Sequence, residues 1–147
     1  MDATLVFPHQ LYEKHPALKP GRPVFLFEDA LLFGPDRHWP LEFHRQKLIL
    51  HRASMKSYAE TLKNEGFKVT YLNCRPDGET ASDLDERLPK KLKRLFLCDP
   101  TDDVLNRRLV RLAKSRSIEL EILPSPNFLT SVEMLETFLP RGKKPFM

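Results

Sequence analysis

The stretch from His44 to Leu72 constrains the fold more than any other part of this 147-residue chain. Its sequence, HRQKLILHRASMKSYAETLKNEGFKVTYL, predicts one long helix, a stop at Gly66 and a strand over 67–72. One face of this helix is apolar at helical spacing, and we expect it to be buried. That face contains Leu48, Met55, Tyr58, Ala59 and Leu62.

The first two turns of this helix carry an unusual inward side. His44, Lys47 and His51 project on the same side as the apolar face, so the inward stripe begins polar and basic. Two interpretations fit this pattern: the three side chains line a ligand pocket, or they extend past the edge of the core into solvent. A separate basic flank is expected to stay in water, and it consists of Arg45, Arg52, Lys56 and Lys63.

Short apolar segments alternate with helical segments along the rest of the chain. Strands are predicted over 4–7, 24–27, 67–72, 94–97 and 118–122. Further helices are predicted over 82–91, with an interruption near Pro89, over 101–114 with Thr101 as N-cap, and over 132–138, while 30–41 is expected to be a long loop. This alternation predicts an α/β fold with a doubly wound, Rossmann-like parallel sheet of five strands in the order 3-2-1-4-5. We expect residues 1–123 to form this domain and 124–147 to form a C-terminal extension.

Polar residues follow the first two predicted strands. In a doubly wound sheet, ligands bind beyond the carboxyl ends of the strands, where the strand order reverses. The N-terminal turns of the long helix lie at the same edge, so the helix pattern and the sheet pattern indicate one place. The predicted site contains six residues: His9, Gln10, Glu28, His44, Lys47 and His51.

Several common motifs of ligand binding and catalysis are absent from the sequence. The five glycines form neither GxGxxG nor GxxxxGK[ST], and Pro8 removes a backbone donor directly after the first strand. There is no nucleophile elbow and no HExxH, so no catalytic set is predicted. Cys74 and Cys98 have no partners at ligand spacing, so no metal site is expected. The residues favour a pocket for a neutral or anionic flat heterocycle over a triphosphate.

The charge pattern leaves two interpretations open. The formal net charge is +4, and basic clusters occur at 90–94, 107–116 and 141–144. Such clusters could lie near DNA phosphates, or they could be solvated helix faces with acidic partners nearby. No RNA-binding sheet signature, zinc-finger spacing or basic zipper is present. No apolar run approaches the roughly 20 residues of a membrane span, and the N-terminus does not resemble a signal peptide, so we expect a cytoplasmic protein.

Four segments together resemble one protein family. They are LVFPHQL near the start, VFLFED, the block FHRQKLILHRASMKSYAETLKNEGFKVTYL, and SPNFLTS near the end. These segments resemble the deoxyribodipyrimidine photolyase-related proteins, the prokaryotic branch of the photolyase/cryptochrome superfamily whose full-length members carry a flavin and an iron–sulfur cluster. The resemblance extends from Thr4 to Met147.

The resemblance implies an N-terminal, Rossmann-like α/β domain that can hold an antenna chromophore, a ribityllumazine in one branch. In the family a larger helical domain follows, with FAD, the cluster cysteines and the DNA lesion site. The tail RGKKPFM resembles the point where the family's chain continues into a linker, so we expect a fragment of a longer protein. The parent would be an FAD-dependent photolyase-like lyase that contacts DNA, and this chain alone would carry no catalytic set.

The resemblance also assigns positions. The family's polar segment after the first strand falls on Pro8–Gln10, its acidic residue after the second strand on Glu28, and its basic helix start on His44 and Lys47. The family often has Gly-Asp in place of Pro8–His9, and the 30–41 loop differs from the family pattern.

Three hypotheses follow for the function. The chain is an antenna-type domain, a stand-alone small-ligand or nucleotide-binding module similar to universal stress proteins, or a structural domain without a chromophore. In the last case Trp39 or Phe43 would fill the pocket, or the missing domain would cover it.

Overall fold

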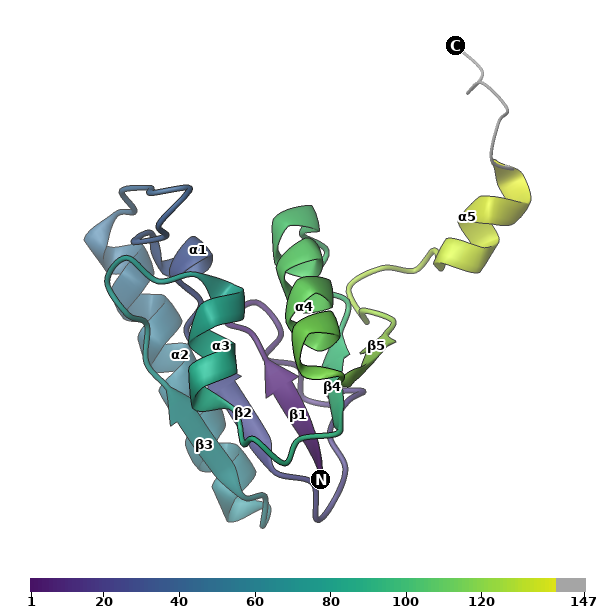
Figure 1. Cartoon of the computed structure of the whole chain (residues 1–147), viewed down its shortest axis with the longest axis horizontal. Helices are drawn as coiled ribbons and strands as arrows, with labels where there is room; N and C mark the ends of the chain where they lie inside the picture. The colour runs from purple at the N-terminus through teal and green to yellow at the C-terminus, as the bar shows by residue number, and fades with distance from the viewer. Residues whose placement is uncertain (140–147) are drawn as a thin grey trace.

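The structure is a computed structural model that describes residues 1–139, apart from the side chain of Val132. Its centre is one parallel sheet of five strands in the order β3-β2-β1-β4-β5 (Figure 1), as the sequence predicts. The strands are β1 (Asp2–Val6), β2 (Val24–Phe27), β3 (Val69–Leu72), β4 (Arg94–Cys98) and β5 (Glu119–Leu123). The α/β, doubly wound fold is therefore confirmed. The predicted linker start, RGKKPFM, lies outside the described residues.

Helices cover both faces of this sheet. They are α1 (Ala30–Phe33), α2 (Arg45–Asn64), α3 (Thr80–Arg87), α4 (Asp103–Arg116) and α5 (Val132–Phe138). α2 packs on one face, α3 and α4 pack on the other, and α5 extends away from the body of the domain (Figure 1). None of the described helices is long and apolar enough to cross a membrane.

The alternation of side chains along β1 and β2 divides the core into two clusters. Leu5 and Phe27 belong to the cluster beneath α3 and α4, whereas Val6 and Leu26 belong to the cluster beneath α2. Because successive side chains of a strand point to opposite faces, two strands that are buried on both sides supply both clusters.

The apolar face of α2 is buried as its helical spacing predicts. Met55, Ala59 and Leu62 are fully covered, and Leu48 and Tyr58 pack at the margin of the same cluster. The helix ends in a Schellman arrangement around Gly66, whose φ of 87° is readily adopted by glycine. There the Phe67 amide donates to the Leu62 carbonyl at 2.9 Å, so the predicted stop is confirmed.

Three local predictions were wrong. Residues 30–33 form the short helix α1 within the predicted loop, because the Asp29 side chain accepts from the Leu31 amide at 2.8 Å and caps it. Thr101 is not the N-cap of α4, since it has a φ of 53° and Asp102 caps the helix instead. Finally, α3 spans Thr80–Arg87 rather than 82–91, because Glu79 caps its start and Leu88, which precedes Pro89, is extended.

Candidate functional site

The point where the strand order reverses, between β1 and β4, is closed by Gln10. This side chain is fully buried, and its Nε2 donates to the carbonyl oxygens of Cys98 (3.0 Å) and Asp99 (3.2 Å). Its Oε1 accepts from the Phe7 amide at 3.4 Å. The Gln10 amide therefore links the carboxyl ends of two strands and is occupied within the fold.

His9 lies directly beside Gln10 and also bridges the two strands. Its Nε2 lies 3.0 Å from the Pro100 carbonyl oxygen, which can only accept, so Nε2 carries the proton. The other ring nitrogen, Nδ1, is a buried acceptor without a partner in the described part of the chain. Burial lowers the pKa of His9, so the ring is held neutral against Phe7.

Glu28 is a fully buried carboxylate with a complete set of donors. Arg52 binds it with two hydrogen bonds of 2.8 Å, the Tyr71 hydroxyl donates at 2.7 Å and the Cys74 amide donates at 2.9 Å. Burial raises the pKa of Glu28, but these donors together lower it by more than burial raises it. The pKa of Glu28 therefore lies below the ordinary value. Glu28 therefore stays ionised and fixes the Arg52 guanidinium.

The three predicted residues of the long helix have separate surroundings. The exposed His44 is the N-cap of α2, where its Nδ1 accepts from the Gln46 amide at 3.3 Å. Lys47 is exposed and places its ammonium 3.5 Å from the centre of the Phe43 ring. His51 packs edge-on against Phe33. Burial and, to a smaller extent, the charge of Lys47 lower the pKa of His51. His44 and Lys47 thus lie outside the core, as the second interpretation of this stripe expects.

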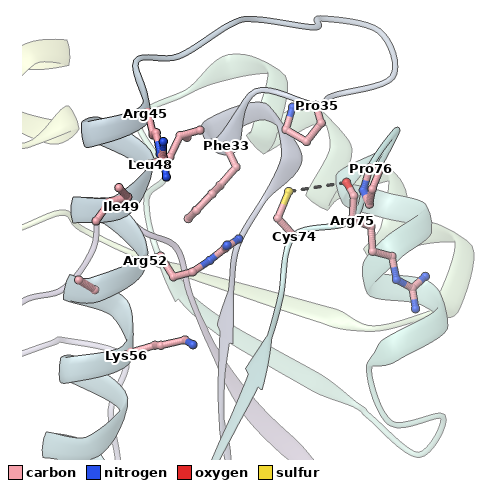
Figure 2. Close-up of a pocket in the computed structure, with 11 residues that line it drawn as sticks. Phe33, Pro35, Arg45, Leu48, Ile49, Arg52, Lys56, Cys74, Arg75 and Pro76 are labelled. Atoms are coloured by element: carbon pink, nitrogen blue, oxygen red, sulfur yellow. Dashed lines mark hydrogen bonds between the residues drawn. The ribbon is translucent and has the colours of Figure 1, made fainter.

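An open groove lies between α2 and the carboxyl ends of β2 and β3. It has a volume of about 520 Å³. Figure 2 shows Arg52 and Lys56 projecting from α2 toward the strands, with Phe33 between the helix and the strands. Its lining combines apolar and basic side chains: Phe33, Pro35, Arg45, Leu48, Ile49, Arg52, Ala53, Lys56, Cys74, Arg75 and Pro76. The basic flank of α2 therefore borders a groove, where the sequence pattern predicted an open solvated face.

The four cations of this groove differ in how they are paired. Arg52 is held by Glu28, and Arg75 pairs with Glu86 at 2.6 Å. Arg45 and Lys56 have no ion-pair partner among residues 1–139, so their charges face the groove without compensation. This arrangement can accept an anionic or strongly hydrogen-bonding ligand beside an apolar wall.

Cys74 lies at the floor of the groove as a neutral thiol. Burial and the neighbouring charge of Glu28 raise its pKa to about 12, so the thiolate is disfavoured. The second cysteine, Cys98, is also free and buried. The described residues contain no cluster of three side chains able to hold a metal ion.

A second polar cluster fixes the loop between α1 and α2. Arg108 is 5% exposed, and it binds both oxygens of Asp36 at 2.5 and 2.9 Å. Its Nε lies 3.3 Å from Glu79, which also binds Arg111. The basic stretch 107–116 therefore does not form one solvated face. Its Arg108 is buried and is paired with Asp36 and Glu79.

The aromatic residues of the same loop leave the groove open. Trp39 is 58% exposed and borders a separate hollow beside α4. Phe43 is covered by Lys47. Gly34 holds the start of the loop at a φ of 104°, where a Cβ atom would lie 2.3 Å from the Leu41 carbonyl oxygen, so only glycine fits.

Comparison with known proteins identifies the family. The profile of the deoxyribodipyrimidine photo-lyase-related proteins matches residues 4–147. The chain belongs to this family. It is also similar to the uncharacterized protein R852 of Acanthamoeba polyphaga mimivirus, with 32% identity over 138 residues, which cover 88% of this chain and 67% of the viral protein. The family assignment that the four sequence segments indicated is therefore confirmed for this photolyase-related protein.

Sequence reasoning missed the basic residues that line the groove of this photolyase-related protein. Arg45, Arg52 and Lys56 were assigned to solvent, although their spacing places them on one side of α2. A buried glutamate after β2 was the available signal, since a carboxylate in that position needs a cationic partner. Whether the six predicted residues bind a ligand stays a prediction.

Proposed function

We propose that this chain is an antenna-type N-terminal domain of a photolyase-related flavoprotein that takes part in light-dependent DNA repair. Family membership and the Rossmann-like sheet support this proposal, because the family's N-terminal α/β domain has such a fold. FAD and the iron–sulfur cluster would belong to a helical domain of the parent protein, which would also contact DNA.

The observation that carries the proposal is the groove beside α2. Its volume of about 520 Å³ is in the range of about 300–1,000 Å³ that small-molecule sites occupy. Phe33, Leu48 and Ile49 offer apolar surface to a flat ring, while Arg45 and Lys56 offer unpaired donors to carbonyl or hydroxyl groups. A ribityllumazine-type chromophore combines such a ring with a hydroxylated chain. When bound, it would absorb near-UV or blue light and pass the excitation to the flavin.

The residues of this chain would divide the work of binding. Arg45 and Lys56 would contact the ligand, and Glu28 would position Arg52 through its two hydrogen bonds. His51 would support Phe33 from within the domain. These roles shift the weight of the predicted site from its histidines to the basic flank of α2.

The test is absorption and fluorescence titration of the purified chain with a ribityllumazine, using two double variants. We expect Arg45→Ala/Lys56→Ala to weaken binding at least tenfold. His44→Ala/Lys47→Ala removes an imidazole and an ammonium group that lie outside the groove, so this variant should bind nearly as tightly as the wild type does. The reverse order would place the ligand at the predicted helix start instead.

A structural domain without a chromophore is the second candidate. The observation in its favour is that the side chains of Gln10 and Glu28 form their hydrogen bonds with other residues of the chain, not with a ligand site. No spectral change at high ribityllumazine concentration would favour this candidate and overturn the antenna proposal. A thermal shift with ATP would instead favour the nucleotide-binding module.

A further inference from the structure

The edge of the sheet where the strands begin, here called the amino edge, gathers four loops into one surface. Backbone hydrogen bonds join these loops: the Lys68 carbonyl accepts from the Val24 amide at 2.9 Å, and the Lys93 amide donates to the Met1 carbonyl at 2.8 Å. The Lys93 carbonyl in turn accepts from the Glu119 amide at 2.8 Å. In Figure 1 this edge is the lower end of the sheet, near the N-terminus.

Exposed lysines without partners stand on this surface. They are Lys19 before β2, Lys68 before β3, and Lys91 and Lys93 before β4. None of the four forms an ion pair with a described residue. Unpaired ammonium groups in neighbouring loops create a positive potential that attracts anions.

Two arginines add to this charge around a single ring. The Arg22 guanidinium lies 3.4 Å from the centre of the Phe96 ring, and that of Arg94 lies 5.6 Å from it. Arg94 is paired with Asp2 at 2.5 Å, whereas Arg22 has no ion pair in the described chain. A shallow groove of about 550 Å³, lined by residues 1–2 and 19–23, runs beside Arg22.

The excess of positive charge survives a count of the neighbouring carboxylates. The six side-chain cations named above outnumber the four neighbouring carboxylates: Asp2, Glu65, Glu119 and, further along β5, Glu121. Helix C-termini reach this edge and favour cations in their last turns, which explains residues such as Lys63 and Lys114. The four unpaired lysines lie in loops outside the helices, so the helix dipole does not account for them.

We propose that the amino edge binds the phosphate backbone of duplex nucleic acid without reading its sequence. From Lys68 before β3 to Lys93 before β4 the edge spans four adjacent strands, or about 14 Å at about 4.8 Å per strand. One strand of duplex DNA presents about four phosphates over that length. The lysines therefore match several phosphates at once.

The composition of the edge distinguishes this partner from two others. Exposed aromatic side chains, which single strands need for base stacking, lie elsewhere: Trp39, Phe128 and Phe138. Met1 is the single exposed large apolar side chain that the described structure places at this edge, so little is available to enter a lipid surface. The inference is independent of the proposed antenna function, which concerns the opposite edge.

The experiment measures fluorescence anisotropy of a labelled random 20-base-pair DNA duplex with the 147-residue chain over a series of salt concentrations. We expect salt-sensitive binding. Lys19→Gln/Lys68→Gln/Lys93→Gln should weaken it at least tenfold at about 100 mM salt and reduce the salt slope by about 3, one for each lost contact.

The matched control is Lys14→Gln/Arg37→Gln/Arg107→Gln, which removes the same charge from exposed positions away from the amino edge. Near-wild-type binding by the control supports the proposal, and circular dichroism verifies that both variants fold. Equal loss in the two variants would overturn it, since only net charge would matter. No binding by the wild type at low salt would overturn it as well. The proposal would also be overturned if the wild-type chain bound phosphatidylserine vesicles but not DNA, and if the lysine variant no longer bound the vesicles.

Discussion

The two edges of the sheet differ in whether their cations are paired with buried carboxylates. At the carboxyl edge, Arg52 and Arg108 are bound to buried carboxylates that follow β2 and the short helix α1. At the amino edge, Lys68 and Lys93 are exposed and have no ion pair within the described chain. The same fold thus pairs Arg52 and Arg108 with buried carboxylates at one edge, whereas Lys68 and Lys93 at the other have no such partner among the described residues.

This difference shows that a basic cluster in the sequence has no single meaning. A cation contributes to stability when a buried carboxylate requires it, because an uncompensated buried charge is costly. A solvated lysine contributes almost nothing to stability and remains available for a partner. Substitutions at the two edges should therefore separate into large and small effects on folding.

The largest effect is expected from Arg108→Met. The substitution leaves Asp36 and Glu79 buried without their shared cation, so we expect the free energy of unfolding to fall by about 3 kcal/mol. Urea denaturation followed by circular dichroism measures this loss. The control is Arg107→Met, whose exposed pair with Asp103 is worth less than about 0.5 kcal/mol. Equal losses in the two variants would contradict the contrast drawn for the carboxyl edge.

Glu28→Gln should have the next largest effect, a loss of about 2 kcal/mol near pH 7, because its charge-assisted hydrogen bonds to Arg52 are lost. The folded-state pKa of Glu28 is depressed, so its contribution is present above the unfolded value of about 4.3 and disappears as the pH falls through the folded value. Thermal unfolding at pH 7 and pH 3 checks this. A gap between variant and wild type that is as wide at pH 3 as at pH 7 would speak against it.

Asp29→Asn should stabilise the domain by about 1 kcal/mol near pH 7.5. Asp29 is the buried carboxylate of this edge whose Oδ2 has no partner among the described residues, and burial raises its pKa to about 6. For a raised carboxyl pKa, stability is fully present below the unfolded value and is lost as the pH rises through about 6, so the gain should vanish near pH 4. Asparagine keeps the cap of α1. Asp102→Asn, at the cap of α4, is the matched control in the same unfolding assay.

The smallest effect is expected at the amino edge. Lys68→Gln and Lys93→Gln should each change the free energy of unfolding by less than about 0.5 kcal/mol, since neither ammonium group has an ion-pair partner among residues 1–139. Denaturation at low and high salt measures this. A loss as large as that of Glu28→Gln would show that these lysines support the fold and would remove the contrast between the edges.

The fold was predictable because its signals are local and repeat. The 3.6-residue spacing of Met55, Ala59 and Leu62 identifies the buried face of α2, and Gly66 marks its end. The helix α1 was missed because four apolar residues, 30–33, show no period. The cap of α4 was placed at Thr101 instead of Asp102 because adjacent polar residues are equivalent in sequence.

The sequence by itself determined the alternating elements, the strand order and the family of this protein. Only the tertiary structure decided which cations form ion pairs with buried carboxylates. Arg52 meets Glu28, 24 residues away, and Arg108 meets Asp36, 72 residues away, because two parallel strands and a loop bring them together. Burial makes such pairing necessary, and burial depends on packing between distant elements, which the local pattern of charges does not record.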